Sequence, residues 1–172
     1  MKSKKEMIIE WLKEQRVDEK NIVRILTAFP EILGLSIEEN LKPKVEWLKE
    51  QGVDEKNIGK ILTIFPQILG CSTNRIEEQL KTFEYFGINR IFILTNCTKY
   101  LINSSQTIYA KMKFIQEKNI CNENSSIEDK IKILNLSWIK FKKQFRLSKE
   151  ELFKRYPLPK EEPKIEKEEE YK

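Results

Sequence analysis

Apolar residues in the first eighty positions recur at helical spacing in two segments of nearly identical sequence. Each segment has apolar side chains at i, i+3, i+4 and i+7, the spacing that places them on one stripe of a helix. The two stripes are Ile22, Ile25, Leu26 and Phe29, and Ile58, Ile61, Leu62 and Phe65. Each stripe predicts an amphipathic helix that ends at an aromatic residue.

The two segments are copies of one another. Residues 10–34 and 46–70 are offset by 36 positions and are identical at 20 of 25. Such identity indicates duplication, and a period near 36 is typical of helical arrays rather than propellers or leucine-rich repeats. Because one repeat cannot bury both faces of its helices, neighbouring repeats must stack. The sequence therefore predicts an all-α helical-repeat solenoid, of right- or left-handed twist.

Each repeat is predicted to contain a helix A, a helix B and a short 3₁₀ turn. In the second repeat, Pro43 suits the first position of helix A, which then runs to Gln51, because its missing N–H would be unpaired there. Alternatively, Ser36 caps an earlier start with Glu39 in a capping box. In that case Pro43 lies inside the helix and kinks it.

The segment after helix A contains turn and cap signals. Gly52 is predicted to end helix A in the left-handed conformation, and Asp54 to cap helix B through its carboxylate. Pro66 cannot extend helix B and also pushes Phe65 away from helical geometry. Residues 67–70 are then expected to form a 3₁₀ turn.

Two further repeats are recognisable but diverged. The third keeps the pattern of residues 83–88 and 93–95, is three residues shorter between them, and has Cys97-Thr98 where Phe-Pro is expected. The fourth begins near Met112 and contains a polar insertion over 119–126. After it, Ser125 and Glu128 predict a capping box, followed by a helix with the apolar stripe Ile127, Ile131, Leu134 and Trp138.

The last helical segment has its own capping box, Ser148 with Glu151, and ends in Tyr156-Pro157. We interpret it as a half-repeat that caps the array. Residues 158–172 consist mainly of proline, lysine and glutamate and are predicted to be a disordered charged tail. The array over 1–157 thus contains about four and a half repeats, near 7–40, 41–76, 77–110, 111–142 and 143–157.

The formal charge of +5 is unevenly distributed along the chain. Residues 1–80 carry 13 basic and 14 acidic side chains, whereas residues 81–156 carry 15 basic and 7 acidic ones. A positive field concentrated on one stretch predicts a polyanionic partner. A chain biased toward lysine also produces solvated basic patches without function.

The residues of common catalytic sites are missing. There is no histidine, which removes the commonest general base and metal ligand, and no phosphate-binding glycine loop or nucleophile elbow. Three cysteines without a C-x-x-C pair argue against a disulfide framework or thiolate metal site. No stretch reaches 18 apolar residues. We expect no enzyme activity, metal, cofactor, small-molecule substrate or membrane span.

The repeat resembles that of the mitochondrial transcription termination factor (mTERF) family. The resemblance rests on residues 41–53, which read LKPKVEWLKEQGV, and continues through Ile58, Ile61 and Leu62 to residues 65–69, which read FPQIL. It is strong over 7–71 and weak over 81–157. Tetratricopeptide and pentatricopeptide repeats have similar periods but lack the Phe-Pro-x-x-Leu phrase at this place.

The resemblance implies a fold and a class of partner. Family members form superhelices of helix–helix–3₁₀ triplets with a positively charged concave groove. They bind double-stranded DNA or structured RNA, and they terminate or regulate organelle transcription or assist ribosome assembly. It also implies a mitochondrion or other organelle as the location. Because this chain is short and lacks a clear import sequence, the cytoplasm of an intracellular bacterium is the alternative.

Lysine and arginine make most phosphate contacts, so they are the candidate nucleic-acid-binding residues. Phe141 and Phe145 alternate with basic residues and either stack on bases or form an i, i+4 core contact. A protein partner on the nearly neutral first two repeats is the alternative to a nucleic acid. The primary candidates are Lys99, Lys111, Lys113, Lys140, Lys142, Lys143 and Arg146, and the secondary ones are Arg75, Arg90, Lys42 and Lys44.

Overall fold

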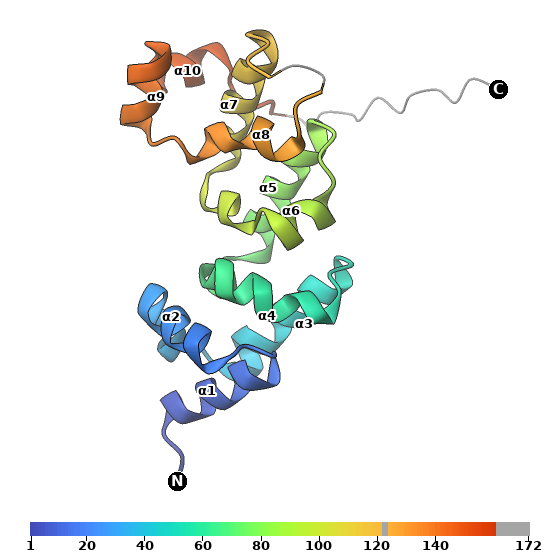
Figure 1. Ribbon diagram of the computed structural model, residues 1–172, viewed down its shortest axis with the longest axis vertical. Coiled ribbons are helices and arrows are strands. Elements are labelled where there is room, and N and C mark those ends of the chain that lie inside the picture. Colours follow the sequence, from blue (N-terminus) through green and yellow to red (C-terminus); the bar gives the residue numbers. More distant parts are fainter. Residues whose placement is uncertain (122–123, 161–172) are drawn as a thin grey trace, which may run out of the picture. The chain divides into compact units, whose positions relative to one another are not determined.

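The computed structural model describes residues 1–121 and 124–160, and within these ranges every regular element is helical (Figure 1). The predicted all-α fold is therefore confirmed. The chain divides into two lobes: residues 1–77 with 90–101 form the first, and residues 78–89 with those from 102 onward form the second. The predicted disordered tail lies outside the described residues from position 161.

Helix–helix–3₁₀ triplets follow one another along the chain, in the order that the sequence predicts. The first two are α1 (Lys4–Glu14), α2 (Glu19–Ala28) and η1 (Pro30–Gly34), then α3 (Lys42–Glu50), α4 (Glu55–Ile64) and η3 (Pro66–Leu69). The next two are α5 (Thr73–Tyr85), α6 (Arg90–Asn96) and η4 (Thr98–Ile102), then α7 (Ser105–Glu117), α8 (Ile127–Ile131) and η5 (Lys132–Asn135). A further pair, α9 (Trp138–Phe145) and α10 (Lys149–Arg155), follows.

Helix A of the second repeat starts before Pro43, as in the alternative prediction. A π-helical turn, η2 (Ile37–Leu41), runs directly into α3, and the Ser36 hydroxyl accepts the Glu39 N–H at 3.2 Å. The capping box is not reciprocal, since the Ser36 N–H donates to Asn40 Oδ1 at 2.8 Å. The wider π turn accommodates Pro43, which has no N–H to donate.

Each helix A is followed by a residue with positive φ. Within the described part of the chain, the positive-φ residues are Arg16 (62°), Gly52 (91°), Gly87 (73°), Asn119 (48°) and Arg146 (57°). They follow α1, α3, α5, α7 and α9 in turn. The predicted left-handed Gly52 is therefore confirmed, and the same turn marks five successive helix pairs.

In the first four of these turns, the residue after the left-handed one closes a hydrogen bond back onto helix A. Its N–H donates to the carbonyl five residues earlier, which is the Schellman arrangement. The bonds are Val17 to Leu12, Val53 to Leu48 and Ile88 to Phe83, each 3.1 Å, and Ile120 to Ile115 at 3.2 Å.

The end of the array differs from the prediction. Ser126 rather than Ser125 caps α8, because its hydroxyl accepts the Asp129 N–H at 3.1 Å. Two adjacent serines precede two adjacent acids, so the capping pattern fits either register. The predicted continuous helix from residue 127 to Trp138 is wrong, since α8 ends at Ile131 and α9 begins after Ser137. The last repeat is thus a full helix pair that starts near 138 rather than a half-repeat from 143.

The predicted stripes form the core of the first lobe. Ile58, Ile61, Leu62 and Phe65 are at most 5% exposed, and the 3₁₀ turn expected over 67–70 is present one residue earlier, as Pro66–Leu69. In the first repeat, Leu26 is only half-buried although its counterpart Leu62 is fully buried. The difference arises because the first repeat covers the second.

A close backbone contact joins the first two repeats. Helix α2 packs on α4, and α4 on α6. A Cβ built on Gly59 would lie 2.7 Å from the Gln15 carbonyl oxygen and 3.0 Å from that of Arg16. Only a glycine permits this approach of α4 to the end of α1. Val23, which holds the corresponding position of α2, is 64% exposed.

We predict that Gly59→Ala destabilises the chain. Alanine normally stabilises an exposed helix by about 1 kcal/mol relative to glycine. Here the added methyl must displace a carbonyl, and overpacking of this kind costs about 1–3 kcal/mol. Urea denaturation measures the free energy of unfolding. Gly34→Ala is the control, because nothing lies within 4 Å of its built Cβ. An unchanged or higher stability for Gly59→Ala would contradict the contact.

Candidate nucleic-acid interface

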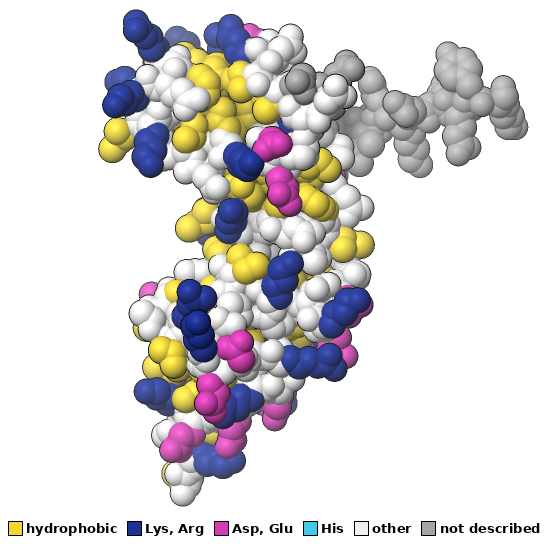
Figure 2. All heavy atoms as spheres, in the orientation of Figure 1, with side chains coloured by type: hydrophobic (Ala, Val, Ile, Leu, Met, Phe, Trp, Pro, Cys, Tyr) yellow, Lys and Arg dark blue, Asp and Glu magenta, His cyan; other side chains and the backbone are white. Residues whose placement is uncertain are grey.

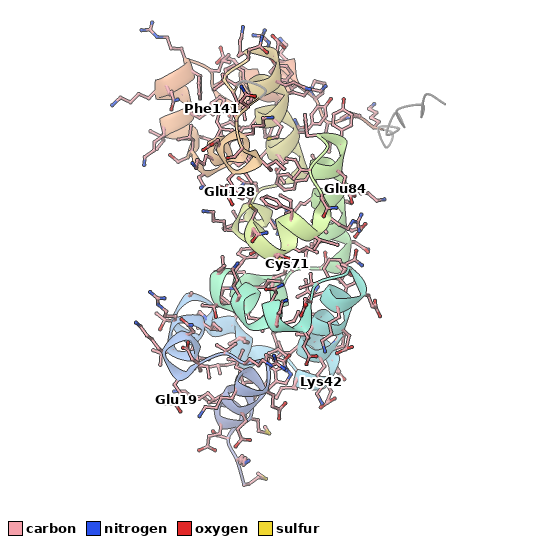
Figure 3. The ribbon with its side chains drawn as sticks, turned by 45° about the vertical axis from the view of Figure 1, so that its right-hand side comes forward. Glu19, Lys42, Cys71, Glu84, Glu128 and Phe141 are labelled. Atoms are coloured by element: carbon pink, nitrogen blue, oxygen red, sulfur yellow. The ribbon has the colours of Figure 1, made fainter. Side chains whose placement is uncertain are left out.

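Helix α9 is anchored in the second lobe by its aromatic residues. Phe141 is fully buried, and its ring centroid lies 5.5 Å from that of Phe114 on α7 and 4.8 Å from that of Phe145. Figure 3 shows Phe141 inside this part of the fold rather than on its surface. The prediction of an i, i+4 core contact is confirmed, and Phe141 is not available to stack on a base.

The partner helix α10 is held against α7 by polar contacts. The Tyr156 hydroxyl donates to Glu117 Oε2 at 2.5 Å, and Gln106 Nε2 donates to the Tyr156 carbonyl at 2.8 Å. The predicted capping box is confirmed, because the Ser148 N–H donates to Glu151 Oε2 at 2.7 Å and the Ser148 hydroxyl accepts the Glu151 N–H. These contacts fix the helix pair that carries the basic surface.

The outer side of α9 carries the basic residues that the sequence singled out. Lys140, Lys142, Lys143 and Arg146 are all exposed, and none forms an ion pair within the described residues. Residues 130–149 contain seven basic side chains and no acidic one. In Figure 2, dark blue side chains gather over α9 and α10. We call these four residues, three on α9 and Arg146 directly after it, the α9 basic surface.

An acid close in sequence to this surface, Glu151 on α10, is already engaged. The pKa of Glu151 is lowered, mainly by the hydrogen bonds from the Ser148 N–H and hydroxyl, and to a smaller extent by the charge of Lys142. Because the Glu151 carboxylate is held by its own helix cap, it does not form an ion pair with the α9 lysines.

Aromatic stacking on this surface is disfavoured by ammonium groups that already occupy the rings. Lys149 Nζ lies 5.9 Å from the Trp138 centroid and 5.4 Å from that of Phe153, and Lys111 Nζ lies 4.5 Å from the Trp138 centroid. The apolar side chain that does face solvent is Ile139, which is 84% exposed. Lys149 was not predicted, although it belongs to the same acid-free stretch.

The prediction that Lys111 contacts phosphate is wrong. Its side chain is 1% exposed, and Nζ donates to the Leu136 carbonyl at 2.7 Å inside the second lobe. The ammonium also lies over Trp138 and Phe141. Burial lowers the pKa of Lys111 to about 8. The residue joins α7 to the chain between η5 and α9 and has no surface role.

Lys111 belongs to a clamp that recurs in three repeats. Lys44 Nζ donates to the Cys71 carbonyl at 2.6 Å, and Gln79 Nε2 donates to that of Asn103. Each donor lies on helix A, eight residues before the positive-φ residue, and each acceptor follows the 3₁₀ helix of the same repeat. Figure 3 labels Cys71, the acceptor in the first lobe. Lys44 is therefore also a buried structural residue, contrary to its prediction as a candidate.

The other predicted residues are dispersed. Lys99 is exposed on η4, with Nζ 5.1 Å from the Tyr100 centroid, and Arg75 is exposed near the start of α5. Arg90 Nη1 lies 3.0 Å from Glu77 Oε1 and donates to Gln51 at 2.7 Å, which joins repeats within the first lobe.

Two more candidates already have partners. Lys113 is half-buried, with Nζ 5.0 Å from the Tyr85 centroid and 5.9 Å from that of Phe86. Lys42 is exposed and pairs with Glu38 at 2.5 Å. Among the candidates, the structure brings together only those on α9.

Successive helix pairs, each with a left-handed residue after its first helix and the first four followed by a 3₁₀ helix, define a helical-repeat protein with a basic surface. The mTERF family model matches residues 1–124. The chain therefore belongs to the mTERF family, as the repeat pattern predicted. No curated protein and no solved structure matches it. The match ends before α8, so the α9 basic surface lies outside the matched residues.

The structure also gives a pH-dependent prediction for Lys111. Its pKa of about 8 lies below the ordinary 10.5, so the unfolded chain binds more protons between these values. Stability rises with pH wherever the unfolded state binds more protons. We expect the unfolding free energy of the wild type, minus that of Lys111→Met, to increase from pH 8 to pH 10.5. Urea titrations measure it, with exposed Lys154→Met as control. A flat difference would refute the burial of the ammonium.

Proposed function

We propose that this protein binds nucleic acid through the α9 basic surface, with double-stranded DNA as the preferred form. The observation that carries the proposal is a group of four exposed cations, three on α9 and Arg146 directly after it, that have no ion pair within the described residues. Membership of the mTERF family, whose repeats bind nucleic acids, supports it. The role that follows is regulation or termination of transcription, in a mitochondrion or another organelle.

The charge arrangement suits a phosphate backbone. Lys and Arg side chains release condensed counterions when they contact phosphates, and this release supplies most of the affinity. Because the α9 cations have no internal acidic partner, binding to phosphate does not first require an ion pair to break. Lys142 and Lys143 also lie in the last turn of α9, where positive charge is favourable to the helix dipole.

The same surface suits structured RNA, which is the alternative in a ribosome-assembly role. Phosphate contacts position a protein on a nucleic acid but carry no sequence information. Among the described residues, no helix is long and apolar enough to cross a membrane.

A protein-interaction scaffold is the second candidate function, and an apolar groove on the first repeat favours it. The groove lies between α1 and α2, with Ile9, Val23 and Leu26 in its lining and Lys5 at its edge. The corresponding residues of the second repeat include Val45 and Leu62, which are buried because the first repeat covers them. The equivalent face of the second repeat packs against helices of the first repeat. The groove is therefore a kind of surface that already binds helices within this chain.

We predict that DNA affinity falls steeply with salt and depends on α9. The logarithm of the binding constant should fall linearly with the logarithm of salt concentration, by about 0.9 for each phosphate contacted on duplex DNA. Replacing Lys140, Lys142 and Lys143 together with Glu should weaken binding by roughly tenfold or more at moderate salt. Gel shifts with duplex DNA, duplex RNA and single strands measure both effects.

A charge-matched variant controls for net charge. Lys4, Lys5 and Lys49 lie on α1 and α3, and their joint replacement with Glu changes the charge equally. The control should keep most of the affinity, and circular dichroism should show that both variants are folded. Binding that is insensitive to salt, or equally weakened in both variants, would rule out the α9 surface. A protein partner held by the first two repeats should bind both the wild type and the α9 variant.

A further inference from the structure

The near-neutral charge of the first two repeats conceals a separation of charge between their helices. After their first residue, α2 and α4 contain no acidic side chain, whereas α1 and α3 together carry five glutamates. The basic residues of the B helices are Lys20 and Arg24 on α2, and Lys56 and Lys60 on α4. In Figure 2, dark blue side chains lie over α2 and α4, and magenta ones gather over α1.

These four residues occupy equivalent positions in the two repeats. Within each helix the two cations are four residues apart, which places them on one face about 6 Å apart along the axis. Helices α2 and α4 pack against one another in the first lobe, and packed helices lie about 8–10 Å apart. The offset of 36 residues makes Arg24 the counterpart of Lys60, and Lys20 that of Lys56. The result is a two-by-two array of positive charges.

The array is open to solvent and almost free of internal ion pairs. All four side chains are exposed. Within the described residues, Lys20, Arg24 and Lys60 form no ion pair, and Lys56 lies 3.4 Å from Asp54. The acids at the first helical positions, Glu19 and Glu55, favour the helix dipole there. The charges of the array are therefore available to an external anion.

We propose that Lys20, Arg24, Lys56 and Lys60 form a second phosphate-binding surface, on which two successive repeats contact the backbone of one nucleic acid. This inference rests on the proposed nucleic-acid-binding function and adds a site that the net charge of the first two repeats argues against. The spacing of the array, about 6 Å by about 9 Å, spans two to three nucleotides of a strand that rises 3.4 Å per phosphate. Arg24 supplies a planar fork for bidentate contact with a phosphate.

A nucleic acid fits this surface better than a lipid membrane does. Helices that lie on a membrane place aromatic or leucine side chains beside their cations. Here the aromatic residues that end α2 and α4, Phe29 and Phe65, are 9% and 5% exposed, and Leu62 is fully buried. The B helices thus use their largest apolar groups for the core of the lobe.

The test removes the array without reversing charge. In the full chain, Lys20, Arg24, Lys56 and Lys60 are replaced together with Gln, and duplex DNA binding is measured across a salt series. If all four contact phosphates, the slope of log affinity against log salt should fall by about three to four, since each contact contributes about 0.9. The matched control replaces Lys4, Lys5, Lys13 and Lys49 of the A helices with Gln and should leave the slope unchanged.

Each outcome separates the two proposals. If the wild type shows no salt-dependent binding, the proposed function fails and this inference fails with it. If the α9 variant weakens binding but the array variant behaves as its control, the inference is overturned while the proposed function stands. Vesicles containing phosphatidylserine are tested in parallel. If they bind the wild type and the array residues matter for vesicles but not DNA, the surface is a membrane surface and the inference is wrong.

Discussion

The fold depends on the turn between the two helices of each repeat. A residue with positive φ follows helix A, and in four repeats the next N–H returns to the helix five residues earlier. That next residue is apolar and buried in the first three repeats, as Val17, Val53 and Ile88 show. The turn therefore fixes both the end of helix A and the direction in which helix B leaves. The cap of α4, Asp54, follows two residues after Gly52.

The residue at this turn is glycine only in part of the array. Gly52 and Gly87 adopt positive φ without strain, whereas Arg16, Asn119 and Arg146 hold it with a side chain present. The left-handed conformation costs a non-glycine residue about 1–2 kcal/mol. Its persistence at Arg16, where the Val17 N–H still bonds the Leu12 carbonyl and Val17 is buried, indicates that the hydrogen bond and burial around it determine the backbone. The geometry of the repeat is thus retained where the sequence motif has been lost.

Local sequence patterns predicted the features that one helix and its ends determine. The B-helix stripes, the Asp54 and Ser148 caps, the turn at Gly52 and the Phe-Pro stop all depend on residues within a few positions of one another. The prediction of Ser125 as the cap of α8 was wrong by one residue, since both Ser125 and Ser126 have an acid three residues later. The start of the last repeat near 138 was missed because one apolar period continues across the break after Ile131.

The candidate site was harder to predict than the fold because a lysine's role depends on neighbours far along the chain. Lys111 and Lys113 are two residues apart, yet one is buried against the Leu136 carbonyl and the other lies at the edge of an aromatic cluster. A charge count over a segment treats both as surface cations. Each buried polar donor lies eight residues before the left-handed turn. When the repeats are aligned on those turns, this constant spacing identifies Lys111 as a structural residue.

The contact at Gly59 has a consequence for how the array was assembled. A duplicated segment can stack on its parent only if the incoming helix leaves room for two carbonyl oxygens of the first copy. Glycine leaves that room, and the valine at position 23 of the sister segment does not. The two segments, although nearly identical, therefore cannot exchange places. In a chain with their order reversed, a valine would stand at the contact and prevent the close packing of the two repeats. The absence of a side chain at Gly59 thus determines which of the two copies comes second in the array.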